Sequence, residues 1–521
     1  MSKAGFVQSH STSGFVHALF EKQKELGRGS FGLVNLVKKR STGELQIWKV
    51  VQTRAMPPST LATAQNEVTM LKQLDHPNIV RLFQCADDKP QREIHLLLEY
   101  LAGGDCGTAL REQALSGHGL PEHLVAKVMC QLLMALSYCH RKGVAHLDVK
   151  PENIVFTAPL SACSPPFCKL IDFGLSCQIG SKVADVAGTP EYMAPEVVQQ
   201  RAKKIGGSMD IWSAAATGLH MLCGFAPFGS VQDYLGQIDP VFQRIVSYTS
   251  FERLSTDMQK RPSWLAASDA SKGFFSLLLH ASATARPHAG AALDHAWLRP
   301  YSPKASSPAV LSQPLPEEQM SSIDVFISAS HLARCCQLAV TAHASSSKLA
   351  QVNPWFEALD RDGDGELSFE DLADGLPPTA EYCAADVLTA LDLNHTGKVS
   401  FTAFAAACQF IDHGLAAGAG SMAFDLMDKD GTGQVTLREA LDFFGQNVPL
   451  EEARLPLPGN RPFDRAEWLL CVEEMYMEGF ETTLSSVRSR SSVVMPKGVT
   501  TPGWLDFLHG PAFFLQWGSW I

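Results

Sequence analysis

The chain has 521 residues with 45% hydrophobic content, which excludes a single ordinary core and predicts two to four folded domains. The formal net charge is −11, but residues 351–445 hold 17 acidic against 4 basic side chains, so this stretch carries −13 and the rest is close to neutral. This distribution argues against a general nucleic-acid-binding surface and favours cation binding in the C-terminal part.

The first twenty residues, 1–20, show no clear hydrophobic period and predict a loose N-terminal arm. Position 2 is Ser instead of Gly, and no apolar secretory run follows. We therefore expect neither myristoylation nor a secretory signal.

A glycine-rich stretch follows in a run of strand formers, with Gly27, Gly29 and Gly32. Glycines at this spacing let backbone amides approach phosphate oxygens, although a plain glycine-rich turn gives the same pattern. The interpretation gains weight from Lys49, an inward cation in an apolar strand, and from Glu67, which an amphipathic run places on a helix as a suitable partner for that cation.

Further along, residues 94–101 predict a buried strand and residues 102–105 a turn, after which the chain becomes helical. Residues 125–141 place Val128, Leu132 and Leu136 on one face of a helix. We predict a strand-rich small lobe followed by a helical large lobe, with the nucleotide between them.

The strongest signal is the segment His146–Asn153, followed by Asp172-Phe173-Gly174 and then by Ala194-Pro195-Glu196. With this spacing Asp148 can accept a hydroxyl proton, while Asn153 and Asp172 supply hard oxygen ligands for a magnesium ion on nucleotide phosphates. The three motifs in this order very rarely arise by chance, and they indicate phosphoryl transfer.

On these motifs, residues 21–298 resemble a eukaryotic-type serine/threonine protein kinase. The resemblance implies that ATP and Mg²⁺ are bound and that the catalytic residues are Asp148 (base), Lys150 (contact to the transferred phosphate), Asn153 and Asp172 (magnesium), and Lys49 held by Glu67. It also implies nucleotide contacts from Gly27, Arg28, Gly29, Ser30, Gly32, Val34, Ile47, Lys49, Leu98, Glu99, Leu101 and Asp105. Arg286 resembles the large-lobe arginine that pairs with Glu196.

Three departures from that family pattern matter. Leu147 replaces the Arg that many such kinases place before the base, and Asp185 stands where many relatives carry a phosphorylatable Thr, which suggests that phosphorylation of this loop is not the switch. Ile47 replaces a small residue that faces adenine. These changes keep a rival hypothesis open, a catalytically weak or dead kinase-fold scaffold.

Asp105 and Glu152 lie where relatives that favour basic substrates place carboxylates. Both could attract an Arg or Lys that precedes the phosphoacceptor, or both could be solvated surface acids.

Residues 299–318 are rich in Pro and Ser and predict a linker, and residues 319–350 predict one or two helices. Such a junction segment could be a plain spacer, or it could occupy the catalytic cleft.

The acidic part, residues 351–480, contains loops of twelve residues with oxygen ligands at alternate positions and Gly at the sixth, the pattern of EF-hands. The first loop is a strong match that ends in Asp371, which is shorter than Glu, and its Leu367 is expected to pair with the neighbouring loop. The second ends in Ala403 and is expected to bind calcium poorly. The third ends in Glu439 and is expected to bind most tightly, and Phe463 and Glu467 suggest the remnant of a fourth. The predicted ligands are Asp360, Asp362, Asp364, Glu366 and Asp371; Asp392, Asn394, Thr396 and Lys398; and Asp428, Asp430, Thr432, Gln434 and Glu439.

A kinase domain, a junction and EF-hands together resemble the calcium-dependent protein kinases of plants and protists. The fold class is therefore expected to be α+β, a two-lobed kinase fold followed by an all-α EF-hand domain. In that family the junction blocks the cleft at rest; here it is weakly basic, so pseudosubstrate inhibition is in doubt while apolar docking remains open. A third hypothesis is a constitutive kinase with a calcium-buffering tail.

The 13 cysteines are scattered without a Cys-x-x-Cys pair, so free thiols in a reducing compartment are expected. Residues 211–228 are apolar but are interrupted by Gly, His220 and Pro227, which favours a buried helix over a membrane span. We predict a cytoplasmic monomer that acts on protein substrates and binds no nucleic acid. For the aromatic tail, residues 481–521, we predict only docking onto a domain or partner.

Overall fold

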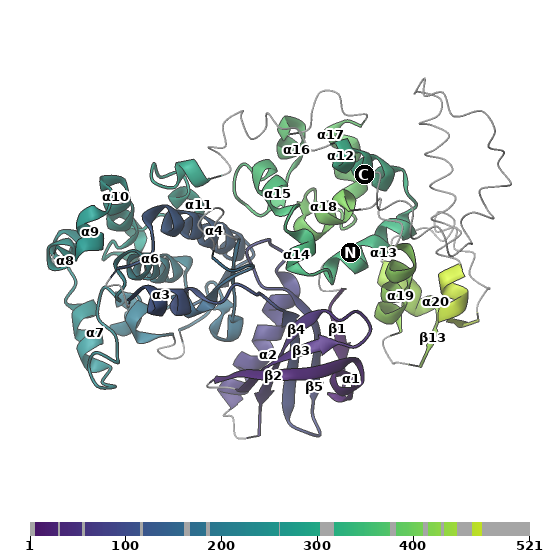
Figure 1. Ribbon diagram of the computed structural model, residues 1–521, viewed down its shortest axis with the longest axis horizontal. Coiled ribbons are helices and arrows are strands. Elements are labelled where there is room, and N and C mark those ends of the chain that lie inside the picture. The colour runs from purple at the N-terminus through teal and green to yellow at the C-terminus, as the bar shows by residue number, and fades with distance from the viewer. Residues whose placement is uncertain are drawn as a thin grey trace.

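A computed structural model describes residues 6–29, 32–54, 58–114, 118–160, 167–183, 188–259, 261–302, 317–375, 382–409, 415–428, 432–444 and 461–470. A strand-rich small lobe and a helical large lobe lie beside a third, helical module that covers one side of both (Figure 1). This arrangement confirms the predicted α+β class with a following helical domain.

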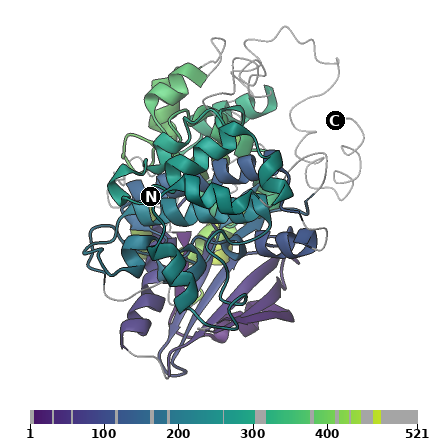
Figure 2. The same cartoon turned by 90° about the vertical axis from the view of Figure 1, so that its left-hand side faces the viewer.

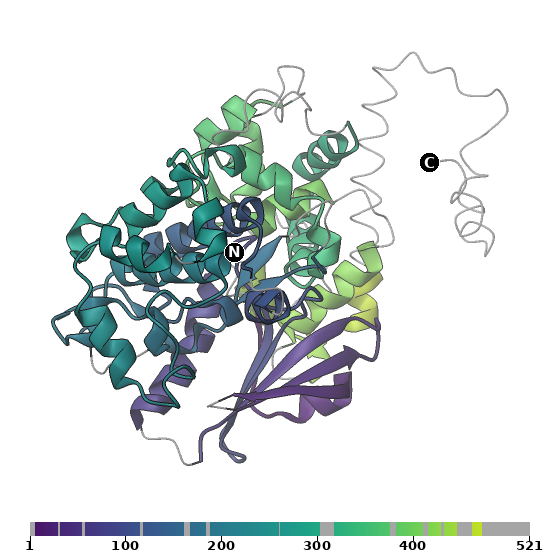
Figure 3. The same ribbon diagram turned by 60° about the vertical axis from the view of Figure 1, so that its left-hand side comes forward.

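The small lobe is built on a six-stranded sheet of order β1-β5-β6-β4-β3-β2, in which β1 pairs in parallel with β5 and the other pairs are antiparallel. Helix α2 (Pro58–Gln73) packs beside it (Figure 3). Its strands are β1 (Gln8–His10), β2 (Phe20–Gly29), β3 (Gly32–Lys39), β4 (Leu45–Gln52), β5 (Leu82–Asp88) and β6 (Glu93–Glu99). The apolar runs predicted as strands around Lys49 and at residues 94–101 are β4 and β6.

The N-terminal residues are not a loose arm over the part that the structure describes, so this expectation was wrong. Residues 8–10 form β1, and α1 (Gly14–Leu19) lies on the outer face of the sheet, where Val16 is buried with Phe20 of β2. The Asp88 carboxylate accepts a hydrogen bond from the Ser13 backbone N–H at 2.7 Å. A three-residue strand and a six-residue helix are too short to show a period in sequence, which is why the pattern missed them.

The large lobe is organised around two long buried helices, α4 (Glu122–Arg141) and α6 (Gly207–Cys223) (Figure 2). Helix α6 is buried along nearly its whole length because its side chains are small or apolar, and it ends at Gly224, whose φ of 79° is left-handed. None of the described helices is long and apolar enough to cross a bilayer. The remaining elements are α3 (Cys106–Ala114), β7 (Val144–Ala145), β8 (Ile154–Phe156), β9 (Cys168–Leu170), β10 (Cys177–Gln178), α5 (Pro195–Val198), α7 (Asp239–Val246), α8 (Phe251–Met258), α9 (Pro262–Ala266), α10 (Asp269–Leu278) and α11 (Ala289–Ala292).

The third module contains the predicted EF-hands and also the junction segment. Helices α12 (Glu317–Ser328) and α13 (His331–Ala342) pack against the EF-hand helices and share one apolar core with them, so the junction is part of the module and neither a spacer nor an insert in the cleft. The other elements are α14 (Ser346–Leu349), α15 (Asn353–Leu359), β11 (Glu366–Leu367), α16 (Phe369–Gly375), α17 (Ala384–Leu391), β12 (Val399–Ser400), α18 (Phe401–Cys408), α19 (Leu415–Met427), β13 (Gln434–Val435), α20 (Leu437–Phe444) and β14 (Phe463–Asp464).

At the interface with the small lobe, the buried His343 ring stacks on Phe83 with centroids 5.7 Å apart. Burial lowers the pKa of His343 from 6.5 to about 4, so the imidazole is neutral in the folded protein. Its contribution to stability is therefore complete above pH 6.5 and is lost as the pH falls toward 4. Between pH 7.5 and 5.5 we expect this residue to cost about 1.4 kcal/mol of unfolding free energy.

Urea unfolding at the two pH values checks this expectation. The His343→Gln variant should lose less stability on acidification than the parent, by about 1.4 kcal/mol, because its side chain does not titrate. An identical pH dependence in both proteins would show that His343 does not contribute.

Candidate active site and calcium-binding loops

Lys49 lies at the centre of a charged cluster between the lobes. Strand β4 places its ammonium 2.7 Å from the Glu67 carboxylate of α2 and 2.8 Å from the Asp172 carboxylate. Burial by itself would lower the pKa of Lys49, but the charges of Glu67 and Asp172 outweigh burial and raise it. Lys49 thus carries a fixed positive charge, held on both sides, at a position where it can meet a phosphate.

Asp172 begins a short turn with a left-handed backbone, φ 60°, which directs its carboxylate toward Lys49. The following Phe173 is fully buried and meets the His146 ring edge to face, with centroids 4.8 Å apart. Burial would raise the pKa of Asp172, but the Lys49 charge lowers it, so this carboxylate is ionised. An anionic oxygen ligand is what a small divalent cation requires.

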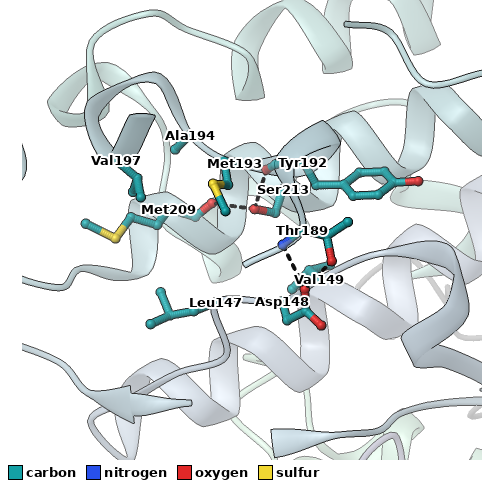
Figure 4. A pocket seen from close by; sticks show the side chains of 10 residues that line it. All are labelled: Leu147, Asp148, Val149, Thr189, Tyr192, Met193, Ala194, Val197, Met209 and Ser213. Carbon is teal, nitrogen blue, oxygen red and sulfur yellow. Dashed lines mark hydrogen bonds between the residues drawn. The ribbon is translucent and has the colours of Figure 1, made fainter. Parts of the chain in front are cut away.

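The Asp148 carboxylate is held by three neighbours, of which Figure 4 draws Thr189. It accepts hydrogen bonds from Lys150 Nζ at 2.6 Å, from Thr189 Oγ1 at 2.7 Å and from Asn153 Nδ2 at 3.0 Å. Because Asn153 uses its amide nitrogen for Asp148, its amide oxygen is the atom that can ligate a cation. The donor set of Asn153 and Asp172 therefore fits a divalent metal.

Asp210, which the sequence reasoning missed, holds the backbone of the catalytic segment in place. It is fully buried in α6, and its carboxylate accepts hydrogen bonds from the backbone N–H groups of His146 at 2.9 Å and Leu147 at 2.7 Å and contacts His140 at 2.8 Å. Burial would raise the pKa of Asp210, but the His140 bond and charge lower it. The available signal was an isolated carboxylate in the first turn of an otherwise apolar helix.

The glycine-rich stretch forms the end of β2 and the start of β3, across from Lys49. Gly27, Arg28 and Gly29 end β2, and the Val34 register position in β3 faces Lys49 in β4. At Gly32 a Cβ would lie 1.8 Å from the Val50 carbonyl oxygen, so the strands approach closely enough to require glycine there. Ser30 lies outside the described residues.

The predicted adenine contacts lie on β4, on β6 and directly after β6. Ile47 pairs with the buried Leu98 across the two strands, and Leu101 is also buried. The Glu99 N–H donates to the Arg81 carbonyl at 3.0 Å. Asp105 instead caps α3, because its carboxylate accepts a hydrogen bond from the Thr108 N–H at 2.8 Å.

The Glu99 side chain lies in a buried charge network that the sequence did not reveal. It meets Lys169 at 3.0 Å and Arg81 at 3.6 Å, and it accepts a hydrogen bond from Ser346 of the EF-hand module. Burial would raise the pKa of Glu99, but the two cations lower it to about 2. The segment that connects the lobes is thus tied to the EF-hand module.

A narrow hollow lies next to Asp148 and is walled largely by apolar side chains (Figure 4). Leu147 is one of them and has a left-handed φ of 66°. Because this apolar residue directly precedes Asp148, its position offers no cation that could bind a phosphate. Asp185 lies outside the described residues. The lining residues are Leu147, Asp148, Val149, Thr189, Tyr192, Met193, Ala194, Val197, Met209 and Ser213.

The first EF-hand loop brings three carboxylates, those of Asp360, Asp362 and Asp364, within 4.8 Å of one another. Asp371 is turned to its own loop, where it accepts a hydrogen bond from the Ser368 N–H at 2.9 Å. Strands β11 and β12 join the first two loops through Leu367 and Val399, which confirms the predicted pairing. The Glu366 carboxylate reaches out of the loop to Lys142, so its backbone carbonyl is the oxygen left for a metal.

The second loop keeps its shape, since Asp392 accepts hydrogen bonds from Thr396 at 3.0 Å and Gly397 at 2.6 Å. Asn394 offers a further side-chain oxygen, but Ala403 offers none. The Lys398 side chain extends to Asp364 of the first loop. The missing carboxylate at Ala403, the last loop position, fits the expected poor calcium binding.

In the third loop, Asp428 accepts hydrogen bonds from the Thr432 and Gly433 N–H groups, each at 2.9 Å, and Glu439 accepts one from Thr436. Gln434 begins β13, which pairs with β14 through Val435 and Phe463. This pairing places Phe463 where the sequence suggested the remnant of a fourth loop. Asp430 lies outside the described residues.

Sequence comparisons with known proteins agree with this arrangement of a catalytic domain followed by EF-hand loops. The protein kinase domain model matches residues 20–298, and an EF-hand model matches residues 352–376. Calcium-dependent protein kinase 16 of Oryza sativa subsp. japonica is 28% identical over 445 residues, 83% of this chain and 76% of the relative. Calcium-dependent protein kinase 5 of Plasmodium berghei is 27% identical over 83% of this chain and 74% of its own length. Calcium-dependent protein kinase 14 of Arabidopsis thaliana is 27% identical over 83% and 78%.

Proposed function

The chain belongs to the protein kinase family, and from this premise we propose that it transfers the terminal phosphate of ATP to Ser and Thr hydroxyls of proteins under the control of calcium bound to its EF-hands. The observation that carries the proposal is the charged cluster in which Lys49 meets Glu67 and Asp172. All of its members would have to be in place for phosphoryl transfer.

In the proposed mechanism Asp148 accepts the proton of the attacking hydroxyl, and its orientation is fixed by the bonds from Thr189 and Asn153. Lys150, 2.6 Å from Asp148, neutralises charge on the phosphate in transfer. Lys49 holds the other phosphates. Asn153 and Asp172 would hold magnesium, which when bound offsets the negative charge of the phosphates.

The scaffold hypothesis is not favoured, because Lys49, Asp148, Asn153 and Asp172 are all present and lie between the lobes in mutual support. Ile47 pairs with Leu98 of the neighbouring strand, so it is part of the sheet and not an isolated side chain in the cleft. Leu147 removes a phosphate clamp but none of the proposed catalytic groups.

Calcium control is supported by the position of the EF-hand module in the same chain and by its contacts with both lobes. Of the proposed calcium sites, the third loop has Glu439 to close it, and the first has the shorter Asp371. The second is proposed to be weak or lost.

For substrates we propose proteins with a basic residue before the acceptor. Glu152 is half exposed near the site and lies 3.9 Å from Arg111, a distance at which an incoming cation can compete. Asp105 is less suited to this role because it caps α3. A cytoplasmic monomer remains our proposal; the free thiols among the described cysteines, including the adjacent Cys335 and Cys336, support a reducing compartment.

Phosphate transfer to peptides tests this function. With MgATP and calcium, the purified chain should phosphorylate a peptide that carries Arg before a single Ser or Thr, and it should leave the matched Tyr and Ala peptides unmodified. Transfer to Tyr alone, or no transfer at any calcium concentration, would contradict the proposal.

A further inference from the structure

The first EF-hand loop is also the surface by which the module holds the large lobe. At the end of α4, the Arg141 guanidinium lies 2.6 Å from the Asp364 carboxylate and 3.6 Å from that of Asp362. The neighbouring Lys142 lies 2.8 Å from Glu366. Asp364 is buried while Arg141 is nearly half exposed, so the carboxylate side of this pair is the part that is shielded from water.

The backbone of the same loop fits against the kinase domain without spare room. At Gly365, whose φ is 80°, a Cβ would lie 2.6 Å from the rings of both His76 and Tyr138. At Gly363 a Cβ would lie 3.1 Å from Leu293. Any movement of the loop must therefore disturb its contact with the large lobe.

The carboxylates that hold Arg141 are the proposed calcium ligands. Asp364 also accepts a bond from Lys398 of the second loop, so two cations already meet one carboxylate. A calcium ion on the same oxygens would lie next to both of these positive charges, which repel it. Calcium and Arg141 thus compete for Asp364.

The opposite end of the module holds the small lobe and the segment between the lobes. Arg81 donates to the Thr341 carbonyl at the end of α13 at 3.2 Å, and Ser346 binds Glu99. Lys348 lies 2.9 Å from Glu44 in the turn between β3 and β4. The module therefore contacts both lobes, beside which it lies in Figure 1.

We propose that the EF-hand module is a brace across the two lobes, and that calcium frees its large-lobe end by displacing Arg141 from the first loop. This proposal rests on the proposed function for its enzymatic consequence: the brace limits the opening of the lobes that nucleotide exchange needs, and calcium restores it. By linkage, a module held by Arg141 binds calcium more weakly at the first loop, and a calcium-loaded loop binds the lobe more weakly.

The test is a calorimetric calcium titration of the full chain, carried out without ATP or peptide. A Glu439→Gln background removes the third site, so that the heat reports on the first loop. There, Arg141→Gln should tighten calcium binding by about 5- to 150-fold, the usual range of coupling between two sites. Arg141→Lys keeps the charge and should stay close to the parent, and Arg253→Gln, which removes an exposed cation of α8, should leave the affinity unchanged.

Lys398→Gln separates the two parts of the proposal. It should tighten calcium binding as well, because it removes a competing cation, but it should leave the contact with the large lobe intact. Hydrogen exchange of the last turn of α4 reports that contact, and it should rise on adding calcium to the parent and be high in Arg141→Gln even without calcium.

Equal calcium affinity in the parent and in Arg141→Gln would overturn the brace. Because the titration needs no catalysis, this result would leave the proposed kinase activity standing. Conversely, tighter binding in a chain that transfers no phosphate would retain the competition and reject the proposed function.

Discussion

Replacing Asp148 by Asn is expected to lower kcat for phosphate transfer by about 10²- to 10⁴-fold, the usual contribution of a general base. Asn keeps the size of the side chain; its one oxygen can accept the bond from Lys150 while its NH2 group faces the Thr189 hydroxyl and donates to it, so the fold around it should persist. It cannot accept the hydroxyl proton. The KM for ATP should change little, because Lys49 and Asp172 are untouched.

Steady-state rates with an Arg- and Ser-containing peptide measure this loss. Asp257→Asn is the matched control, since it makes the same change at an exposed position of α8 and should keep the parent rate. Full activity in Asp148→Asn would reject the base assignment, and with it the mechanism built on it.

The second large effect is expected on stability. Arg286 is fully buried in its side chain and binds both oxygens of Glu196 at 2.8 Å, and it lies over the Trp212 ring at 4.9 Å. Arg286→Ala would leave the Glu196 carboxylate without its main cation in a poorly hydrated place. We expect it to lower the unfolding free energy by about 3–5 kcal/mol, as for other broken buried pairs.

Urea unfolding followed through the kinase domain measures this loss. The control is Arg111→Ala, which removes an exposed partner of Glu152 at 3.9 Å and should cost less than about 1 kcal/mol. Equal losses in the two variants would show that burial of the Arg286 pair adds no stability.

The local parts of the active site could be predicted from sequence. Asp148, Asn153 and Asp172 lie in short motifs whose spacing fixes the turn, and Lys49 and Glu67 lie on a strand and a helix with clear periods. The structure brings these side chains between the lobes. The pairing of the EF-hand loops was predictable for the same reason, because an apolar residue such as Leu367 recurs at the same position of each loop.

Contacts between distant segments could not be predicted in this way. Arg81 binds backbone carbonyls at the end of α13, and backbone groups leave no pattern in the sequence. Asp210 acts through backbone N–H groups of the catalytic segment, again without a motif. The position of the junction depends on which surface its apolar residues cover, and its local period is the same in a spacer, in the cleft or in the EF-hand core.

The most direct test of calcium control is the initial rate of phosphate transfer by the full chain in chelator and in micromolar calcium, at saturating MgATP and peptide. The account predicts a low rate in chelator that rises when calcium is added. A full rate in chelator would instead identify a constitutive kinase with a calcium-buffering module and would contradict the account.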